Sequence, residues 1–162
     1  KLNQACSERI TAADIAAGRH CAPDWLAGHG QAQARRNRKL RHVGGRRGWL
    51  LDHLTTTRPS WNGHNASTWR HYAIMVNGFD TRMRYGGQDR EFGERLCHAG
   101  IRARQIRHQA VCIHLDHPRG YATPESIAAN RAIRMETRRL RRCRAPQGLA
   151  ETQDDSLRIS DD

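Results

Sequence analysis

One stretch of the sequence combines residue types that can carry acid–base chemistry with a spacing that positions them. Residues 77–96 read NGFDTRMRYGGQDREFGERL. Two glycines, Gly86 and Gly87, precede Asp89, and the apolar spacing that follows predicts a helix over residues 89–99. Glycine lets the backbone approach a ligand closely, and a helix start holds a carboxylate rigidly. The stretch therefore predicts a carboxylate that takes a proton from a bound hydroxyl group.

Two histidines follow this predicted helix. His114 and His117 lie in the segment HLDHPR, at and just after a short apolar run over residues 111–115. Imidazole is a common metal ligand, but two histidines three residues apart are weak evidence for a metal site. The spacing alone leaves metal ligands and surface histidines as alternatives.

The residue pattern also predicts the elements that must position these groups. Thr11 to Asp14 forms a capping box that starts a short helix ending near Ala17. Thr123, followed by proline and glutamate, starts a basic helix that runs to about Cys143. Further short helices are expected over residues 31–42 and 70–76. Strands are expected over residues 65–69, 101–106 and 111–115.

The order of these motifs resembles a known enzyme family. The motifs are Asn65-Ala66-Ser67 with Trp69, then Asn77-Gly78-Phe79-Asp80, then Gly86-Gly87-Gln88-Asp89, then His114. This order is similar to that of glycosyltransferase family 2 and of the related galactosyltransferase C-terminal region. The resemblance covers residues 62–119 well and residues 1–58 loosely.

The resemblance implies an α/β fold, namely the C-terminal, acceptor-side half of a nucleotide-diphospho-sugar transferase (GT-A) domain. Residues 1–60 would be a middle segment of that domain, and residues 61–120 would hold the acceptor and the base. A basic helix over residues 121–145 and a disordered acidic tail over residues 146–162 would follow.

The resemblance also assigns roles to individual residues. Asp89 stands where the family has its catalytic base. The residues implied to bind the acceptor or substrate are Gly86, Gly87, Gln88, Asp80 and Asn65. His114, with His117 as a second candidate, stands at the position of a ligand for a divalent metal, Mn²⁺ or Mg²⁺. The implied reaction is an inverting sugar transfer from a nucleotide-sugar donor to a saccharide or lipid-linked acceptor, in cell-wall or polysaccharide synthesis.

The sequence departs from that family in one respect. The family holds its metal and diphosphate with an Asp-x-Asp motif, and no Asp-x-Asp occurs in these 162 residues. We therefore expect a chain that does not hold a donor alone, as a fragment, a truncated reading frame or one partner of a split enzyme. An isolated half would expose apolar surface and self-associate.

Composition limits the partners. The net charge is +12, with 28 Lys and Arg against 16 Asp and Glu, which favours a phosphate-bearing partner such as a nucleotide-sugar, an anionic membrane surface or nucleic acid. Arginines dominate the basic residues, which is equally consistent with a GC-rich genome. Five scattered cysteines without a CxxC motif and no secretion signal predict a cytoplasmic protein, peripheral to the inner face of the membrane if the basic segment 131–144 binds lipid. A solvated surface is the favoured interpretation of that segment.

Two other classes of function stay open. Asp52-His53 and His64-Asn65 resemble the residues of an HNH nuclease, although the resemblance is faint and a nucleic-acid partner is not favoured. The missing Asp-x-Asp would also suit a non-catalytic remnant of a transferase. At Asp89 the simple alternative is a helix-stabilising acid in a first turn. The surrounding motifs favour the base.

Overall fold

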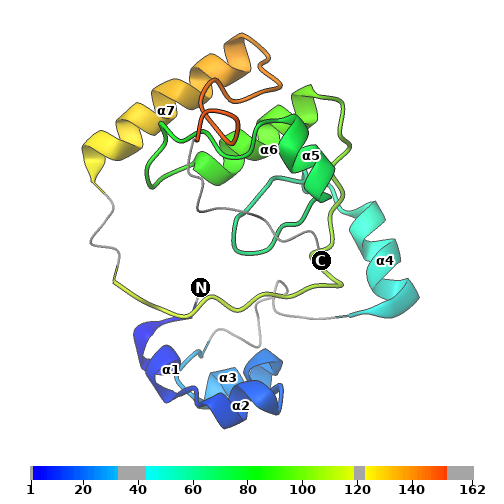
Figure 1. The fold of residues 1–162 in the computed structure, drawn as a ribbon. Coiled ribbons are helices and arrows are strands. Elements are labelled where there is room, and N and C mark those ends of the chain that lie inside the picture. The colour runs from blue at the N-terminus through cyan, green and yellow to red at the C-terminus, as the bar shows by residue number, and fades with distance from the viewer. Residues whose placement is uncertain (1, 33–42, 119–122, 153–162) are drawn as a thin grey trace, which may run out of the picture. The chain divides into compact units, whose positions relative to one another are not determined.

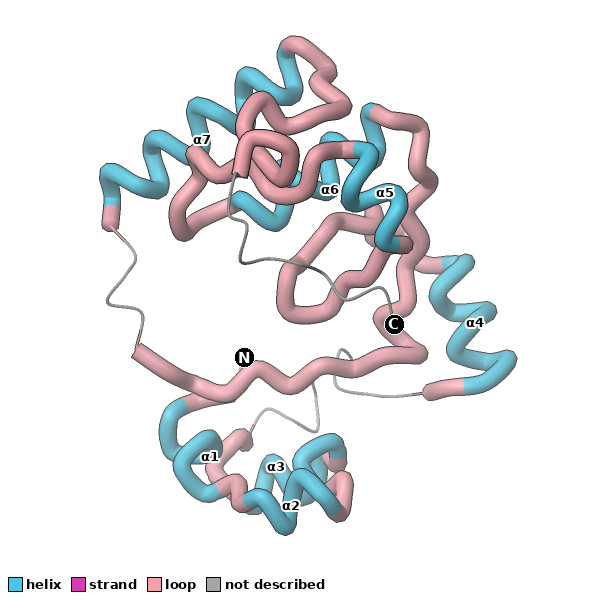
Figure 2. Tube along the Cα trace, viewed as in Figure 1, coloured by secondary structure: helices cyan, strands magenta, loops and turns pink. Residues whose placement is uncertain are grey.

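The computed structural model describes residues 2–32, 43–118 and 123–152, and helices joined by loops and turns make up these ranges (Figures 1 and 2). The chain divides into two compact units. The first unit comprises residues 1–59 and 104–119, and the second comprises residues 60–103 and 120–162. No helix within the described ranges has the length and apolar character needed to cross a bilayer.

The first unit contains short helices with clear start signals. In chain order they are α1 (Gln4–Arg9), α2 (Ala12–Ala16), the 3-10 helix η1 (Arg19–Cys21), α3 (Pro23–Gly28) and α4 (Gly45–Leu54). Asn3 caps α1 by accepting a hydrogen bond from the backbone N–H of Cys6, and Thr11 and Asp14 form a complete capping box on α2. Such caps stabilise helices that are too short to form alone in water.

A small apolar cluster holds the N-terminal helices together. Leu2, Cys6 and Leu26 are buried, and Trp25 and Ile113 pack against them. Ile113 belongs to an extended segment whose His114 carbonyl accepts a hydrogen bond from the Leu2 N–H at 2.9 Å. The segment around Ile113 is therefore covered by helices and makes no sheet contact.

The second unit is built around α5 (Arg70–Met75), α6 (Gln88–His98) and α7 (Pro124–Arg139) (Figure 1). Val76, Phe92 and Leu96 form its buried apolar cluster. The Phe92 ring stacks on Phe79 at a centroid distance of 4.6 Å and meets Trp61 edge-on at 4.8 Å. Phe92 and Leu96 lie on one face of α6, as the apolar spacing predicted.

A fully buried ion pair joins these helices. The Arg95 and Glu91 side chains both have 0% exposure, and Arg95 Nε lies 2.9 Å from Glu91 Oε1. The Arg95 guanidinium also donates to the carbonyl groups of Val76 and Gly78. Glu91 in turn accepts a hydrogen bond from Thr137 Oγ1 on α7 at 2.8 Å. One pair of charges thus connects α6 with α7 and with the turn after α5.

The turn after α5 also holds the segment that follows α7. Asn77, at a φ of 66°, donates from Nδ2 to the Ala145 carbonyl and to Glu151 Oε2, and its Oδ1 accepts from the Ala150 N–H. A Cβ on Gly148 would come within 1.9 Å of the Asn77 carbonyl oxygen, so only glycine fits there. Residues 146–152 are therefore ordered, contrary to the expected disorder from residue 146, and the rest of that tail lies outside the described residues.

The predicted α/β fold is wrong. Across the described ranges the chain is helical and no residue lies in a strand. The expected strands over residues 65–69, 101–106 and 111–115 are loops, turns or unpaired extended chain. An extended segment becomes a strand only when a second one pairs with it, and apolar runs of at most five residues cannot fill the two faces of a parallel sheet.

Most helix predictions are confirmed. The capped helix after Thr11, the helix from Arg70, the helix carrying Asp89 and the Pro124 start all occur. The basic helix ends at Arg139, four residues before the expected Cys143. The expected helix over residues 31–42 falls largely outside the described residues, while the apolar run after Trp49 belongs to the unpredicted helix α4.

We predict that Arg95→Met destabilises the second unit by about 3–5 kcal/mol, because it leaves the Glu91 charge buried without a partner. Urea unfolding followed by circular dichroism measures this loss. Arg90→Met, at an exposed position of the same helix, is the control and should cost under about 0.5 kcal/mol. The double variant Glu91→Gln/Arg95→Met should recover part of the loss, and a double variant as unstable as the sum of the single ones would contradict the pairing.

We also predict that acid weakens the second unit through Glu94. Burial raises the pKa of Glu94, but the hydrogen bonds and charges of Arg134 and Arg138 outweigh it and hold the pKa below the usual 4.5. The stabilisation from this carboxylate is present above pH 4.5 and is lost as pH falls through its lower folded-state pKa. Melting temperatures between neutral and acidic pH should therefore fall less steeply for Glu94→Gln than for the wild type. Glu125→Gln is the matched control, and equal slopes for all three proteins would refute the prediction.

Candidate active site

The two glycines before α6 adopt the backbone that their position requires. Gly86 and Gly87 have φ values of 113° and 86°, in the region that disfavours every other residue type. A Cβ on Gly86 would lie 3.2 Å from Ile127 Cγ1 of α7. The glycine pair thus turns the chain sharply against α7 and leads directly into the first turn of α6.

Asn130 on α7 holds this glycine turn through hydrogen bonds of its side-chain amide. It is buried at 2% exposure, and its Nδ2 donates to the carbonyl groups of Arg84 and Gly86 at 2.8 and 3.0 Å. Its Oδ1 accepts from the Arg84 N–H at 3.2 Å. One amide side chain therefore satisfies three backbone groups of the loop that precedes Asp89.

The Asp89 carboxylate is held at the start of α6 and is half-buried. Its Oδ2 accepts from the Gly63 N–H at 3.1 Å, and its Oδ1 accepts from the Arg90 N–H at 2.7 Å. An ionised carboxylate offers about four acceptor positions, so two remain for another donor. The arrangement fixes the carboxylate in one orientation and leaves capacity to bind a hydroxyl group.

The neighbouring predicted residues divide into two groups. Asn65 lies in the turn that brings Gly63 to Asp89, and its N–H donates to the Asn62 carbonyl at 2.9 Å. Gln88 uses its Oε1 to accept from the Gly86 N–H at 2.8 Å, so it closes the glycine turn. The structure thus brings Gly86, Gly87, Gln88 and Asp89 into one local arrangement within the second unit, and the turn that contains Asn65 reaches Asp89 through the Gly63 N–H.

Asp80 does not join them. Its side chain has 0% exposure and is bound by the Arg82 backbone N–H and guanidinium group. Burial raises the pKa of Asp80, but the hydrogen bonds and charge of Arg82 outweigh it, and the net pKa lies below its usual value. An acceptor-binding role at the site wall has no support, because the carboxylate faces inward and closes the turn after Gly78.

His114 and His117 belong to the first unit, and their imidazoles contact each other. The two Nε2 atoms lie 3.2 Å apart, and His117 Nδ1 lies 3.0 Å from the Pro118 carbonyl oxygen. A carbonyl only accepts, so His117 Nδ1 carries a proton, and in a neutral His117 the Nε2 accepts from His114 Nε2–H. The two rings thus form a hydrogen-bonded pair.

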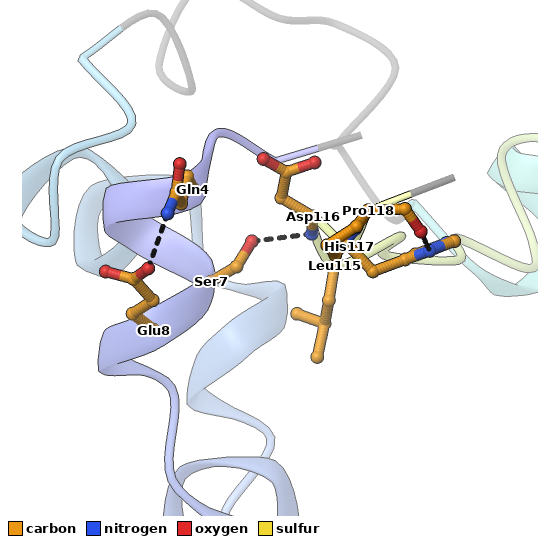
Figure 3. Close-up of a pocket in the computed structure, with 7 residues that line it drawn as sticks. All are labelled: Gln4, Ser7, Glu8, Leu115, Asp116, His117 and Pro118. Carbon is orange, nitrogen blue, oxygen red and sulfur yellow. Dashed lines mark hydrogen bonds between the residues drawn. The ribbon is translucent and has the colours of Figure 1, made fainter. Parts of the chain in front are cut away.

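A hollow of about 500 Å³ adjoins this pair (Figure 3). Gln4, Ser7 and Glu8 of α1 line one side, and residues 115–118 line the other. Ser7 Oγ accepts from the Asp116 N–H at 2.8 Å, and Gln4 donates to Glu8 at 2.8 Å. The first bond joins the two walls, and the second lies within α1.

The implied Mn²⁺ or Mg²⁺ does not fit the residues that the structure brings together. Both ions prefer oxygen ligands, whereas the two predicted ligands here are imidazoles bound to each other. Within the described ranges no group of three His, Cys, Asp or Glu side chains converges on one point. The metal role of His114 and His117 therefore stays a prediction from the resemblance, and no chemical step is derived through it.

Asp52 and His53, which faintly resemble nuclease residues, make structural contacts instead. Asp52 is buried, and its two carboxylate oxygens accept from the His108 N–H at 2.9 Å and from Gln109 Nε2 at 2.8 Å. The His53 ring packs on Trp49, with Nδ1 lying 2.7 Å from the Trp49 carbonyl oxygen. The Asp52 carboxylate positions α4, and its burial at 6% exposure leaves it little accessible to a metal ion.

Sequence reasoning missed Asn130, Glu91 and Arg95. The signal for Asn130 was a residue of poor helix propensity in the middle of a predicted helix, where it must have a specific partner to be favourable. The signal for Glu91 and Arg95 was their four-residue spacing on the same side of α6 as Phe92, although such pairs usually lie on an exposed face.

No protein-family model, curated protein or solved structure matches this chain.

We predict that Asn130→Asp loosens the glycine turn. The carboxylate keeps the acceptor for the Arg84 N–H but loses both donors, which leaves two buried carbonyls unpaired at a cost of about 1–3 kcal/mol. Hydrogen exchange at residues 84–88 should accelerate more than exchange elsewhere in α6. Arg131→Ala, at the adjacent exposed position of α7, is the control, and unchanged exchange in Asn130→Asp would disprove the supporting role.

Proposed function

We propose that this chain supplies the acceptor-binding side and the catalytic base of a nucleotide-sugar glycosyltransferase. The observation that carries the proposal is the oriented Asp89 carboxylate, which follows two glycines of positive φ and has free acceptor capacity. The proposal rests on this local arrangement and on the motif order, and it does not depend on an α/β fold.

In the proposed reaction a hydroxyl group of the acceptor attacks the anomeric carbon of the donor sugar. Its proton passes to the Asp89 carboxylate as the new carbon–oxygen bond forms. The bond between the anomeric carbon and the diphosphate breaks, and its electron pair leaves with the nucleoside diphosphate. Attack from the side opposite the leaving group inverts the anomeric configuration.

Local features suit a sugar acceptor. Gly86 packs against Ile127 of α7, whereas a Cβ on Gly87 would meet only Arg134 Cδ at 4.0 Å, so a sugar ring can approach the backbone at Gly87. Trp69 belongs to the loop that contains Asn65, and its side chain is 73% exposed, as is typical of aromatic residues that stack on sugar faces. The acceptor would be a saccharide or a lipid-linked sugar.

The cellular setting follows from the donor and from the thiols. Four of the five cysteines, namely Cys6, Cys21, Cys97 and Cys143, carry free thiols. Free thiols suit the reducing cytoplasm, where nucleotide-sugars are available. We therefore place the proposed transfer in the cytoplasm.

We predict that Asp89→Asn lowers sugar transfer by at least about 100-fold, because the amide cannot take the proton. The assay complements the purified protein with an extract of source cells that lack this chain, which supplies a donor-binding partner and the acceptors, adds radiolabelled UDP-, GDP- and dTDP-sugars, and follows label in the acceptor fraction. Glu125→Gln removes an acid from the first turn of α7 and is the matched control with full transfer expected.

The outcomes separate the alternatives. Circular dichroism must show that Asp89→Asn keeps its helices, because the fold does not depend on that charge. Transfer by Asp89→Asn at the wild-type rate would eliminate Asp89 as the base. A wild-type protein that binds saccharides in NMR saturation-transfer experiments but transfers no label would instead be a non-catalytic glycan-binding protein.

A further inference from the structure

Helix α4 presents its apolar side chains outward. Its buried positions are Gly48 and Asp52, which are four residues apart and therefore lie on one face. A Cβ on Gly48 would lie 3.3 Å from the His108 carbonyl oxygen, and Asp52 accepts hydrogen bonds from His108 and Gln109. A small residue and a hydrogen-bonded carboxylate thus dock α4 onto the segment around His108.

The opposite side of α4 is an exposed apolar surface. Leu50 and Leu54, which are 50% and 69% exposed, lie opposite Gly48 and Asp52. Trp49 and Leu51, which are 48% and 40% exposed, lie on the two flanks of the helix and widen this surface. Burying four large apolar side chains in an apolar medium is strongly favourable, so their exposure on a 10-residue helix indicates an interaction surface. The hydrogen bonds of Asp52 prevent the helix from turning these side chains inward.

Arginines surround this apolar surface. Arg46 and Arg47 lie in the first turn of α4 and are exposed, and Arg58 follows the helix. Arg104 and Arg107 contact the C-terminal end, where Arg104 Nη2 lies 3.5 Å from His53 Nε2 and Arg107 Nη1 donates to Thr57 Oγ1. Between residues 43 and 58 the only acid is the buried Asp52.

We propose that α4 lies in the surface of an anionic lipid bilayer. Trp49 and the three leucines would enter the boundary between headgroups and acyl chains, and the surrounding arginines would contact lipid phosphates. Exposed leucines with a tryptophan beside basic residues are the pattern of helices that lie in the membrane interface. This docking surface is independent of Asp89 and of the proposed transfer.

The charge pattern favours a bilayer over the other occupants of an apolar surface. A second copy of this chain would bring its own arginines against the arginines around α4 of the first copy. Repulsion between these like charges opposes self-association through this surface. Nucleic acid would satisfy the arginines but would leave the leucines without apolar contact. An anionic bilayer supplies phosphates for the arginines and hydrocarbon for the leucines.

Vesicle co-sedimentation of the full chain tests this proposal. We expect binding to vesicles of phosphatidylcholine mixed with phosphatidylglycerol and little binding to phosphatidylcholine alone. Leu50→Glu/Leu54→Glu should weaken binding at least about tenfold, because two apolar contacts are replaced by charges that anionic lipid repels. Met135→Glu/Leu140→Glu is the matched control, since these residues are similarly exposed, at 61% and 45%, at the C-terminal end of α7.

The charge contribution is tested separately. Arg46→Gln/Arg47→Gln should weaken binding by about 25-fold, since each arginine near an anionic surface contributes roughly fivefold. Arg131→Gln/Arg139→Gln makes the same charge change on α7 and should weaken binding much less, because the proposed lipid contact is made by α4. Circular dichroism of each variant confirms that the helices are retained.

Three results would overturn the proposal. The first is no binding of the wild type to phosphatidylglycerol vesicles. The second is greater loss in the α7 variants than in the α4 variants, which would move the contact to the basic helix. The third is a loss of vesicle binding in Arg46→Gln/Arg47→Gln while Leu50→Glu/Leu54→Glu binds fully. That result would indicate a purely electrostatic ligand such as nucleic acid.

Discussion

The second unit depends on the buried guanidinium of Arg95. Removing a charge from water is costly, and it is tolerated only where opposite charge and hydrogen-bond acceptors surround it. Glu91 supplies the charge, and the Val76 and Gly78 carbonyls accept the other guanidinium protons. Because these acceptors have fixed positions, α6 cannot rotate without leaving a buried charge unpaired. Asp89 lies two residues before Glu91, so the same constraint fixes the orientation of the candidate base.

Buried polar side chains hold together segments that apolar side chains would hold together in other small proteins. Among the described residues of the second unit, Val76, Phe92 and Leu96 are the fully buried members of the apolar cluster, whereas Asn77 and Asn130 each bind backbone groups of distant segments. This explains how a chain with a mean hydropathy of −0.86 still orders its loops. Hydrogen bonds are directional, so such anchors fix loop geometry more sharply than apolar contacts do. That property suits a turn that must hold a carboxylate in one orientation.

The sequence predicted local structure well and long-range structure poorly. The capping box at Thr11, the Pro124 helix start and the apolar spacing of α6 depend on neighbours along the chain, and all were visible. The strand at residues 111–115 was expected because its apolar run matches a buried strand, but pairing depends on a partner that no local pattern specifies. Asp80 was expected at the site wall, but its side chain is buried and bound by Arg82 two residues later, a local pairing that the motif comparison did not consider. Of the candidate site, sequence motifs found Asp89 and the glycines but not Asn130, whose partners lie more than 40 residues away.

Buried polar side chains set the orientation of α6 in the second unit and of α4 in the first. The apolar side chains of α6 face the core as a result, whereas those of α4 face outward. In α6 a buried acid and a buried arginine share the inner face with Phe92 and Leu96, so the apolar residues face the core. In α4 the buried residues are Asp52 and Gly48, so the leucines face outward. Rotating α4 to bury the leucines would place them against the turn at His108. The same rotation would remove the Asp52 carboxylate that accepts a hydrogen bond from the His108 N–H. A polar anchor therefore keeps an apolar surface available, which a helix oriented by its apolar stripe could not do.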